Sequence, residues 1–260
     1  MLADLGRRAL KLTRLLTFAT GRRGLRYGVG AAVEHWRALS GLDVATVVDI
    51  GANKGQFALF VMEVFPGVTV YSFEPLNEPA TRLRKMLAGK VKLFETAIGP
   101  YEGQGTIYVS RRSDSSSLLP IAKQSQVFPG TELKEERIIP ITPLTSHLSQ
   151  EDIKQPAMLK IDVQGYELET LIGCDPLLSC FQYVYLECSF TELYQGQALA
   201  EDIILYLVER NFQLSGVYNQ VEDSGRRPVQ ADFLFTKCDS HRTPCKSASL
   251  CREVDGERPR

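Results

Sequence analysis

Three acids, each near the end of a short apolar run, are the residues of this 260-residue sequence best placed for chemistry: Asp49, Glu74 and Asp162. If the runs are parallel strands, their carboxyl ends form the edge at which open α/β sheets bind ligands. Carboxylates there attract a cation and accept hydrogen bonds from hydroxyl groups. The pattern therefore predicts a site for a positively charged, hydroxyl-bearing ligand.

The loop after the first apolar run carries the strongest local signal. Residues 47–57 read VVDIGANKGQF, an apolar run that ends in an acid and then passes two glycines into a helical stretch. A dinucleotide fingerprint starting at Gly51 would need glycines where Asn53 and Gln56 stand, and the Gly-Lys-Ser/Thr ending of a P-loop is absent. Because Asp49 would also repel a phosphate, the loop favours a phosphate-free, cationic nucleoside.

The second acid and its surroundings complete the nucleoside site. Glu74 lies 23 residues beyond Gly51 and ends the second apolar run, where it can accept hydrogen bonds from both hydroxyls of a ribose. Asn77 is expected to add a contact. Small residues around Ala97, at the end of the third run, leave room for a flat base.

The third acid lies near the end of a further apolar run, beside a lysine and ahead of another acid. Lys160 and Asp162 are two residues apart, so on a strand they face the same side, and Glu167 starts the next helix. Asp162 is the first candidate to accept a proton from an alcohol or to orient it, and Glu167 is the second. A divalent ion on Asp162 could do the same work, although no ligand set is visible. The structural alternative is that Lys160 pairs with Asp162 while Glu167 stabilises a helix N-terminus.

Alternating strands and helices must position these residues. β-branched runs separated by helical stretches from residue 44 onward indicate a parallel sheet of βαβ units. The expected strands are 47–50, 68–73, 91–98, 158–163, 183–188, 212–217 and 231–236, and the expected helices are 56–65, 79–87, 167–172 and 199–210. Residues 103–110 suggest an edge strand or hairpin, and the polar stretch 113–134 is expected to be a functional loop.

Composition excludes several classes of protein. The formal net charge of -1 disfavours a whole-chain basic surface for nucleic acid, and six cysteines are too few for a disulfide scaffold. No apolar stretch approaches a membrane span and no secretory leader is visible, so we expect a cytoplasmic protein. We expect one domain over residues 41–237 and a mobile tail over 238–260, whose Cys and His spacing fits no zinc pattern.

Residues 1–40 are expected to form a helical extension. Residues 1–26 contain seven basic side chains and one acid, with apolar residues at helical spacing on one face. This basic amphipathic helix would pack on the domain or form a dimer arm; the alternative is contact with an anionic membrane surface.

Beyond these motifs, the sequence resembles the FkbM-type family of S-adenosylmethionine-dependent methyltransferases over about residues 28–237. The resemblance rests on the segments DIGANKGQF at 49–57, FEP at 73–75 and LKIDVQGYELE at 159–169. It departs from the family at Gln164 and Thr145, where acids are common. It implies a Rossmann-like class I methyltransferase fold, with a seven-stranded, mostly parallel sheet that ends in an antiparallel hairpin.

The resemblance also implies site roles and a reaction. Gly51, Asn53 and Gly55 would line the methionine part of the cofactor and Glu74 would hold its ribose. The cofactor-binding residues are therefore expected to be Asp49, Gly51, Ala52, Asn53, Gly55, Glu74, Asn77 and Ala97. Residues 114–117 resemble a serine-rich segment of the family and would cover the site.

The implied reaction is methylation of a hydroxyl on a sugar, glycan or secondary metabolite. Two alternatives remain: a non-catalytic cofactor-binding module recruited through the N-terminal helix, and a nicotinamide-dependent oxidoreductase, which the glycine pattern disfavours. His35 and His147 are bases by residue type, but no motif places them, so surface or capping roles are expected for both.

Overall fold

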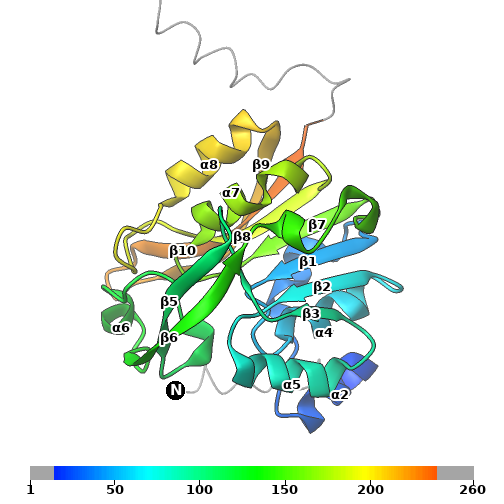
Figure 1. Ribbon diagram of the computed structural model, residues 1–260, viewed down its shortest axis with the longest axis horizontal. Coiled ribbons are helices and arrows are strands. Elements are labelled where there is room, and N and C mark those ends of the chain that lie inside the picture. The colour runs from blue at the N-terminus through cyan, green and yellow to red at the C-terminus, as the bar shows by residue number, and fades with distance from the viewer. Residues whose placement is uncertain (1–14, 239–260) are drawn as a thin grey trace, which may run out of the picture.

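A seven-stranded sheet forms the centre of the molecule, with the strand order β3-β2-β1-β7-β8-β10-β9 (Figure 1). The structure is a computed structural model that describes residues 15–238. The strands are β1 (Thr46–Ile50), β2 (Thr69–Phe73), β3 (Lys92–Phe94), β7 (Ala157–Ile161), β8 (Tyr183–Ser189), β9 (Phe212–Glu222) and β10 (Pro228–Lys237). The first five pair in parallel, whereas β10 is antiparallel to both of its neighbours. The expected mostly parallel sheet with an antiparallel last hairpin is confirmed.

Helices cover both faces of this sheet, which explains why its central strands are apolar throughout. Every residue of β1 and β7 is buried, as expected for strands covered on both faces. One face packs against α2 (Ala19–Arg26), α4 (Gln56–Val64) and α5 (Asn77–Leu87), and the other against α7 (Glu167–Leu178) and α8 (Ala200–Glu209) (Figure 1). The carboxyl ends of β1, β2 and β7 are thereby held in one rigid row.

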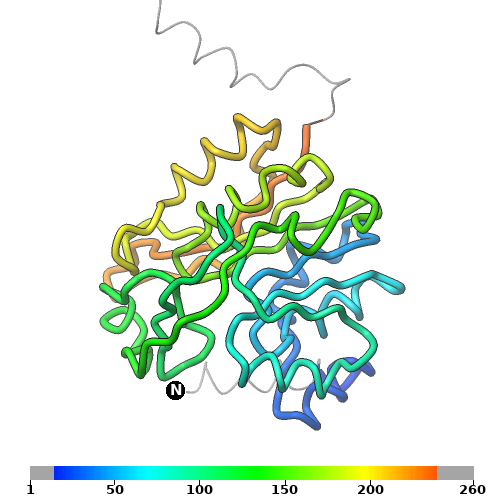
Figure 2. Tube along the Cα trace, in the orientation of Figure 1, coloured from blue at the N-terminus to red at the C-terminus, as the bar shows by residue number. Residues whose placement is uncertain are grey.

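A second, three-stranded sheet corrects the expectation of one long third strand at residues 91–98. That stretch divides into β3 and β4 (Ala97–Ile98), and β4 pairs with β6 (Leu133–Thr142), which also pairs with β5 (Gly103–Ser110). The segment leaves the main sheet after β3 and returns to it at β7 (green in Figure 2). We did not predict β6 because its first half is charged and Pro140 interrupts the isoleucines of its second half.

The polar stretch 113–134 contains short helices between β5 and β6. They are η2 (Ser113–Ser115) and α6 (Gln124–Val127), and β6 already starts at its end. Further short turns are η1 (Val33–His35), α3 (Trp36–Leu39), η3 (Leu144–Ser146) and η4 (Gln150–Asp152). Other boundaries differ from those expected by a few residues, and α7 continues to Leu178, six residues beyond the expected end of that helix.

Residues 15–40 pack on the main domain. Leu15, Val29 and Leu39 are buried in the same apolar core as α4. Most of the expected basic helix, and most of the expected tail with His241, Cys245 and Cys251, lie outside the described residues.

Within residues 15–238, no helix has both the length and the apolar character needed to cross a bilayer. Within the same range, no three His, Cys, Asp or Glu side chains are grouped closely enough to bind a metal ion. Cys174, Cys180 and Cys188 are buried free thiols, as expected for core residues.

Candidate functional site

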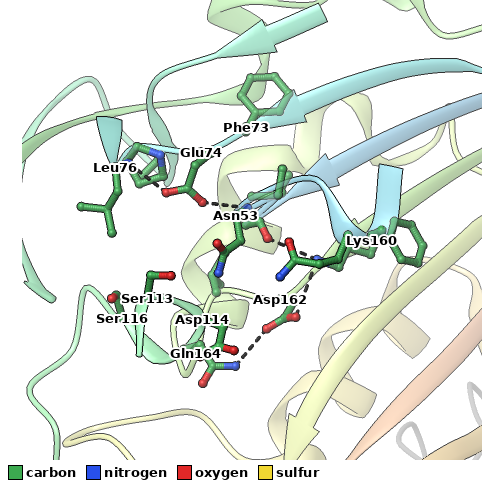
Figure 3. A pocket seen from close by; sticks show the side chains of 18 of the residues that line it. Asn53, Phe73, Glu74, Leu76, Ser113, Asp114, Ser116, Lys160, Asp162 and Gln164 are labelled. Atoms are coloured by element: carbon green, nitrogen blue, oxygen red, sulfur yellow. Dashed lines mark hydrogen bonds and ion pairs between the residues drawn. The ribbon is translucent and has the colours of Figure 1, made fainter. Parts of the chain in front are cut away.

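A cavity of about 520 Å³ opens at the carboxyl ends of β1, β2 and β7. This volume lies within the usual range for small-molecule sites. Seven of the residues predicted for the site line it: Gly51, Ala52, Asn53, Glu74, Ala97, Lys160 and Asp162. Figure 3 shows that Asn53 and Glu74 follow neighbouring strands, while Ser113, Asp114 and Ser116 approach from the segment between β5 and β6. The structure therefore brings the three predicted motifs and the predicted covering segment to one cavity.

The loop after β1 is held tightly against the end of β7. Gly51 has a φ of +77°, and a Cβ atom there would lie 1.9 Å from the carbonyl oxygen of Asp162. Only glycine fits this position without moving the backbone. The N–H groups of Gly51 and Ala52 both donate to the carbonyl oxygen of Phe73, at 3.0 Å each. The next residue, Asn53, has a φ of +46°, and its buried side-chain oxygen accepts no hydrogen bond within the described part of the chain.

Glu74 is fixed by backbone hydrogen bonds from two loops. Its Oε2 accepts a hydrogen bond from the N–H of Asn53 at 2.9 Å, and its Oε1 accepts one from the N–H of Leu76 at 2.8 Å. The residue is only 6% exposed. Burial raises the pKa of this carboxyl group to about 7, despite the two N–H donors, which act in the opposite direction. Both oxygens retain lone pairs for ligand hydroxyls.

A buried ion pair links β1 to β7 beneath the cavity. The Lys160 ammonium lies 3.1 Å from Oδ1 of Asp49. It also lies 3.7 Å from Oδ2 of Asp162 (Figure 3). Burial lowers the pKa of Lys160, but the two carboxylates outweigh this effect and raise it overall. Burial raises the pKa of Asp49, opposed by the attraction of Lys160. Lys160 is therefore a cation that orients carboxylates and is not suited to act as a base.

The amide of Gln164 joins Asp162 to a second carboxylate. Its Nε2 donates to Oδ1 of Asp162 at 2.9 Å and to Oε2 of Glu187 at 3.0 Å, while its Oε1 accepts a hydrogen bond from the Tyr194 hydroxyl at 2.9 Å. The Tyr194 oxygen also lies 3.1 Å from the carbonyl oxygen of Ser115. An acid in place of Gln164, as is common in the family, would bring a third carboxylate beside those of Asp162 and Glu187. Burial and the charge of Asp162 raise the pKa of Glu187 well above its ordinary value.

Three of the residues predicted to bind the cofactor do not line the cavity. Asp49 is completely buried beneath it. Gly55 begins α4 with a φ of +87°, and a Cβ atom there would come within 3.1 Å of Leu83, so its role is helix packing. Asn77 begins α5, where its Oδ1 accepts a hydrogen bond from the hydroxyl of Thr81 at 3.2 Å.

Glu167, predicted as a catalytic residue, also lies outside the cavity wall. Its Oε1 accepts hydrogen bonds from the N–H groups of Val163 at 3.2 Å and Gly165 at 3.0 Å. Burial raises the pKa of its carboxyl group to about 7. These contacts fit the structural alternative, in which Glu167 stabilises the turn between β7 and α7 and so holds Asp162 in place.

The expected surface or capping role of His35 is wrong, because His35 is a cavity residue with partners on distant strands. It lines the cavity and its Nδ1 lies 2.8 Å from the Tyr185 hydroxyl and 3.2 Å from Oδ2 of Asp232. The only signal available in the sequence was its place in the GAAVEH segment at residues 30–35, which does not reveal partners on distant strands. His147, by contrast, does not line the cavity and is hydrogen-bonded to Thr142 at 2.9 Å.

The polar groups of this cavity fit S-adenosylmethionine. The Glu74 carboxylate suits a ribose diol, and the side-chain oxygen of Asn53, which has no partner among the described residues, can accept a hydrogen bond from a ligand. Ala97 and Ile98 leave an apolar wall for a base. The carboxylates of Asp49 and Asp162 offset the charge of Lys160, so the cavity tolerates a cationic ligand.

Comparisons with known proteins agree with these features. Residues 49–214 match the family described as the methyltransferase FkbM domain. The chain is 26% identical over 196 residues to "2-O-methyltransferase NoeI" of Sinorhizobium fredii, an alignment that covers 71% of this chain and 79% of that protein. It is 23% identical over 154 residues to "Methyltransferase 1" of Beauveria bassiana, which covers 51% of this chain and 59% of that protein.

Among solved structures, the magnesium protoporphyrin IX methyltransferase ChlM of Synechocystis with bound SAM superposes with a TM-score of 0.44 at 13% identity, covering 80% of this chain and 77% of that one. The family match extends from the loop after β1 to the last hairpin and includes all three motifs that line the cavity. The chain therefore belongs to the FkbM methyltransferase family, and S-adenosylmethionine is its cofactor.

Proposed function

We propose that this protein transfers the methyl group of S-adenosylmethionine to a hydroxyl oxygen of a sugar, a glycan or a related secondary metabolite. The observation that carries the proposal is Asp162, a cavity-lining carboxylate that is 42% exposed and is held between Lys160 and Gln164. Such a group can accept a hydrogen bond from an alcohol brought to the cavity. Similarity to a protein named as a 2-O-methyltransferase supports oxygen as the acceptor atom.

The residues of the chain bind the cofactor, orient the acceptor and exclude water. When bound, S-adenosylmethionine supplies an electrophilic methyl group on a positively charged sulfur. Glu74 accepts hydrogen bonds from the ribose hydroxyls, and the loop of Gly51, Ala52 and Asn53 holds the methionine part. Asp162 orients the acceptor hydroxyl, because its carboxylate is fixed by two donors. The alignment of nucleophile and methyl group is the main contribution required of such an enzyme.

Two further features of the cavity support an alcohol acceptor. The side chains of Ser113, Asp114 and Ser116 line it from the segment between β5 and β6, and offer hydroxyl and carboxylate groups to a polyhydroxylated molecule. We also propose that this segment restricts the access of water to the reacting groups, which favours methyl transfer to an alcohol.

Radiometric methyl transfer would test the proposal. Full-length protein is incubated with tritiated S-adenosylmethionine and a panel of methyl glycosides and hydroxylated aromatic compounds, beside the Asp162→Asn variant. We expect label in at least one hydroxylated acceptor and about a hundredfold loss in the variant, typical of removing a group that acts on the transferred proton or its oxygen.

Other outcomes would support the alternatives. Binding of S-adenosylmethionine without turnover on any acceptor, unaffected by Asp162→Asn, would indicate a non-catalytic module. Binding of NAD in place of S-adenosylmethionine would indicate an oxidoreductase and would contradict the proposal.

A further inference from the structure

His35 connects the N-terminal extension to three strands at the opposite end of the chain. Its Nδ1 lies 2.8 Å from the hydroxyl of Tyr185 on β8 and 3.2 Å from Oδ2 of Asp232 on β10. The same Oδ2 accepts hydrogen bonds from the Tyr185 hydroxyl at 2.9 Å and from Nδ2 of Asn219 on β9 at 2.7 Å. The His35 ring also packs edge-on against Phe57, at 5.4 Å between centroids.

These contacts determine which nitrogen of His35 carries the proton. Tyr185 has one hydroxyl proton, and it is donated to Asp232. The carboxylate of Asp232 has only lone pairs to offer, and its pKa is lowered by His35, Asn219 and Tyr185 although burial acts in the opposite direction. Nδ2 of Asn219 lies farther from Nδ1, at 3.4 Å, and donates to Asp232 at 2.7 Å. The two oxygens closest to Nδ1 therefore require a donor, so Nδ1 bears the hydrogen.

The second ring nitrogen remains available. Within residues 15–238, no hydrogen bond reaches Nε2 of His35, although the residue lines the cavity and its side chain is 16% exposed. In a neutral imidazole with hydrogen on Nδ1, Nε2 carries a lone pair. An imidazole held by a carboxylate at one nitrogen and free at the other is the arrangement used by general bases that activate hydroxyl groups.

We infer that His35 is the general base of the methyl transfer, that it acts through Nε2, and that Asp232 and Tyr185 are the positioning residues that set its tautomer. This inference rests on the proposed transfer to a hydroxyl oxygen. In the step, the acceptor O–H proton moves to Nε2, and the oxygen electron pair forms the new bond to the methyl carbon. The former carbon–sulfur bonding pair stays on sulfur, whose positive charge disappears as the imidazolium forms. His35 then releases its proton to solvent.

Asp162 and His35 have different roles in this arrangement. A general base must offer a lone pair that no other hydrogen bond occupies. Asp162 already accepts a hydrogen bond from Gln164 and lies beside Lys160, so it is suited to orient the hydroxyl. His35 has the free lone pair that the proton requires.

Nitrogen-15 NMR tests the tautomer without an acceptor. The chain has three histidines, so the long-range imidazole spectrum of the full-length protein is simple, and the His35→Asn variant assigns the His35 signals. We expect neutral His35 to carry hydrogen on Nδ1 and none on Nε2, and the Asp232→Asn variant to lose this preference. Hydrogen on Nε2 of neutral His35 would overturn the inference.

Methyl transfer tests the catalytic role with a variant that keeps the structural one. His35→Asn retains a side-chain N–H that can donate to Asp232 but lacks Nε2. We expect kcat to fall at least about 100-fold while the Kd for S-adenosylmethionine changes less than about threefold. Added imidazole should restore part of the activity of His35→Ala. The matched control, His147→Ala, should retain kcat because His147 lies outside the cavity.

The outcomes separate this inference from the proposed function. Full activity of His35→Asn in an enzyme whose wild type methylates an alcohol would overturn the inference alone. A wild type that methylates no hydroxylated acceptor would contradict the proposed function and this inference with it. Loss of activity in His35→Asn with unchanged cofactor binding and thermal stability, together with rescue by imidazole, would support both.

Discussion

Binding of S-adenosylmethionine should weaken as the pH falls, because Glu74 must be ionised to accept both ribose hydroxyls. The pKa of its buried carboxyl group is raised to about 7. When the Glu74 carboxyl group is protonated, one of its oxygens carries a hydrogen where a ribose hydroxyl needs an acceptor. A bound cationic cofactor further favours the ionised form of Glu74. The experiment therefore changes the pH between about 8 and 6 and compares the wild type with Glu74→Gln, which lacks the titrating carboxyl group.

The expected magnitude follows from the ionised fraction. With a pKa of about 7, this fraction falls from roughly 90% at pH 8 to roughly 10% at pH 6, so the Kd should rise about tenfold, or about 1.4 kcal/mol. Glu74→Gln should bind about 10 to 150 times more weakly than the wild type at pH 8, because it loses a charged acceptor contributing about 1.5–3 kcal/mol. Its Kd should vary much less with pH.

Stability of the cofactor-free protein should change in the same pH range. The folded pKa of Glu74, about 7, lies above its ordinary value of 4.5, so the folded state binds the proton more tightly. Stability is therefore lost as pH rises from about 4.5 to 7, by about 3 kcal/mol from this group. The Glu74→Gln variant should not lose stability in this way as the pH rises. In the wild type, bound cofactor should offset the loss because it stabilises the ionised carboxylate.

Isothermal titration calorimetry at pH 6, 7 and 8, in buffers of different ionisation enthalpy, measures both the Kd and the protons released. Glu167→Gln is the matched control, since the carboxyl group of Glu167 is also buried with a pKa of about 7 but lies outside the cavity wall. The control should keep the pH dependence of the wild type. A pH dependence that persists unchanged in Glu74→Gln would refute the assignment of Glu74 to the ribose.

Two further substitutions test the loops that form the cavity. Gly51→Ala should destabilise the protein by several kcal/mol and abolish cofactor binding, because its Cβ would lie 1.9 Å from the carbonyl oxygen of Asp162. Thermal denaturation measures the loss of stability. The control is Gly41→Ala, which should change the melting temperature little because no atom lies within 4 Å of its Cβ. Gln164→Glu should place a third carboxylate beside Asp162 and Glu187, so its melting temperature should fall relative to the wild type as pH rises from 6 to 8. An equal or higher melting temperature at pH 8 would contradict the bridging role of the amide.

Several parts of the fold and site could be predicted from local sequence because local physics determines them. The loop at residues 49–55 joins a buried strand to a helix, and its positive-φ glycines are visible as residue types. Glu74 could be placed beside this loop because neighbouring parallel strands end at the same edge of a sheet. Alternation of apolar strands and helices was sufficient to predict the seven-stranded sheet.

Elements that depend on their pairing partner could not be predicted in this way. Residues 91–98 have the composition of one strand, yet Ala97 pairs with β6 in a different sheet. The first half of β6 is charged, and Pro140 interrupts the isoleucines of its second half. This segment is a strand because β4 and β5 pair with it. This second sheet contributes Ala97, Ile98 and Ile107 to the cavity wall.

The division between sequence and tertiary structure is clearest in the functional residues. Residue type and spacing determined the family and the side of the cavity that we propose for the cofactor, since those groups follow neighbouring strands. Only tertiary structure decided that Glu167 stabilises a turn, and that His35 meets Tyr185, 150 positions away in the chain. A side chain's role as base or anchor depends on which partners occupy its hydrogen-bonding groups, and packing of distant segments determines those partners.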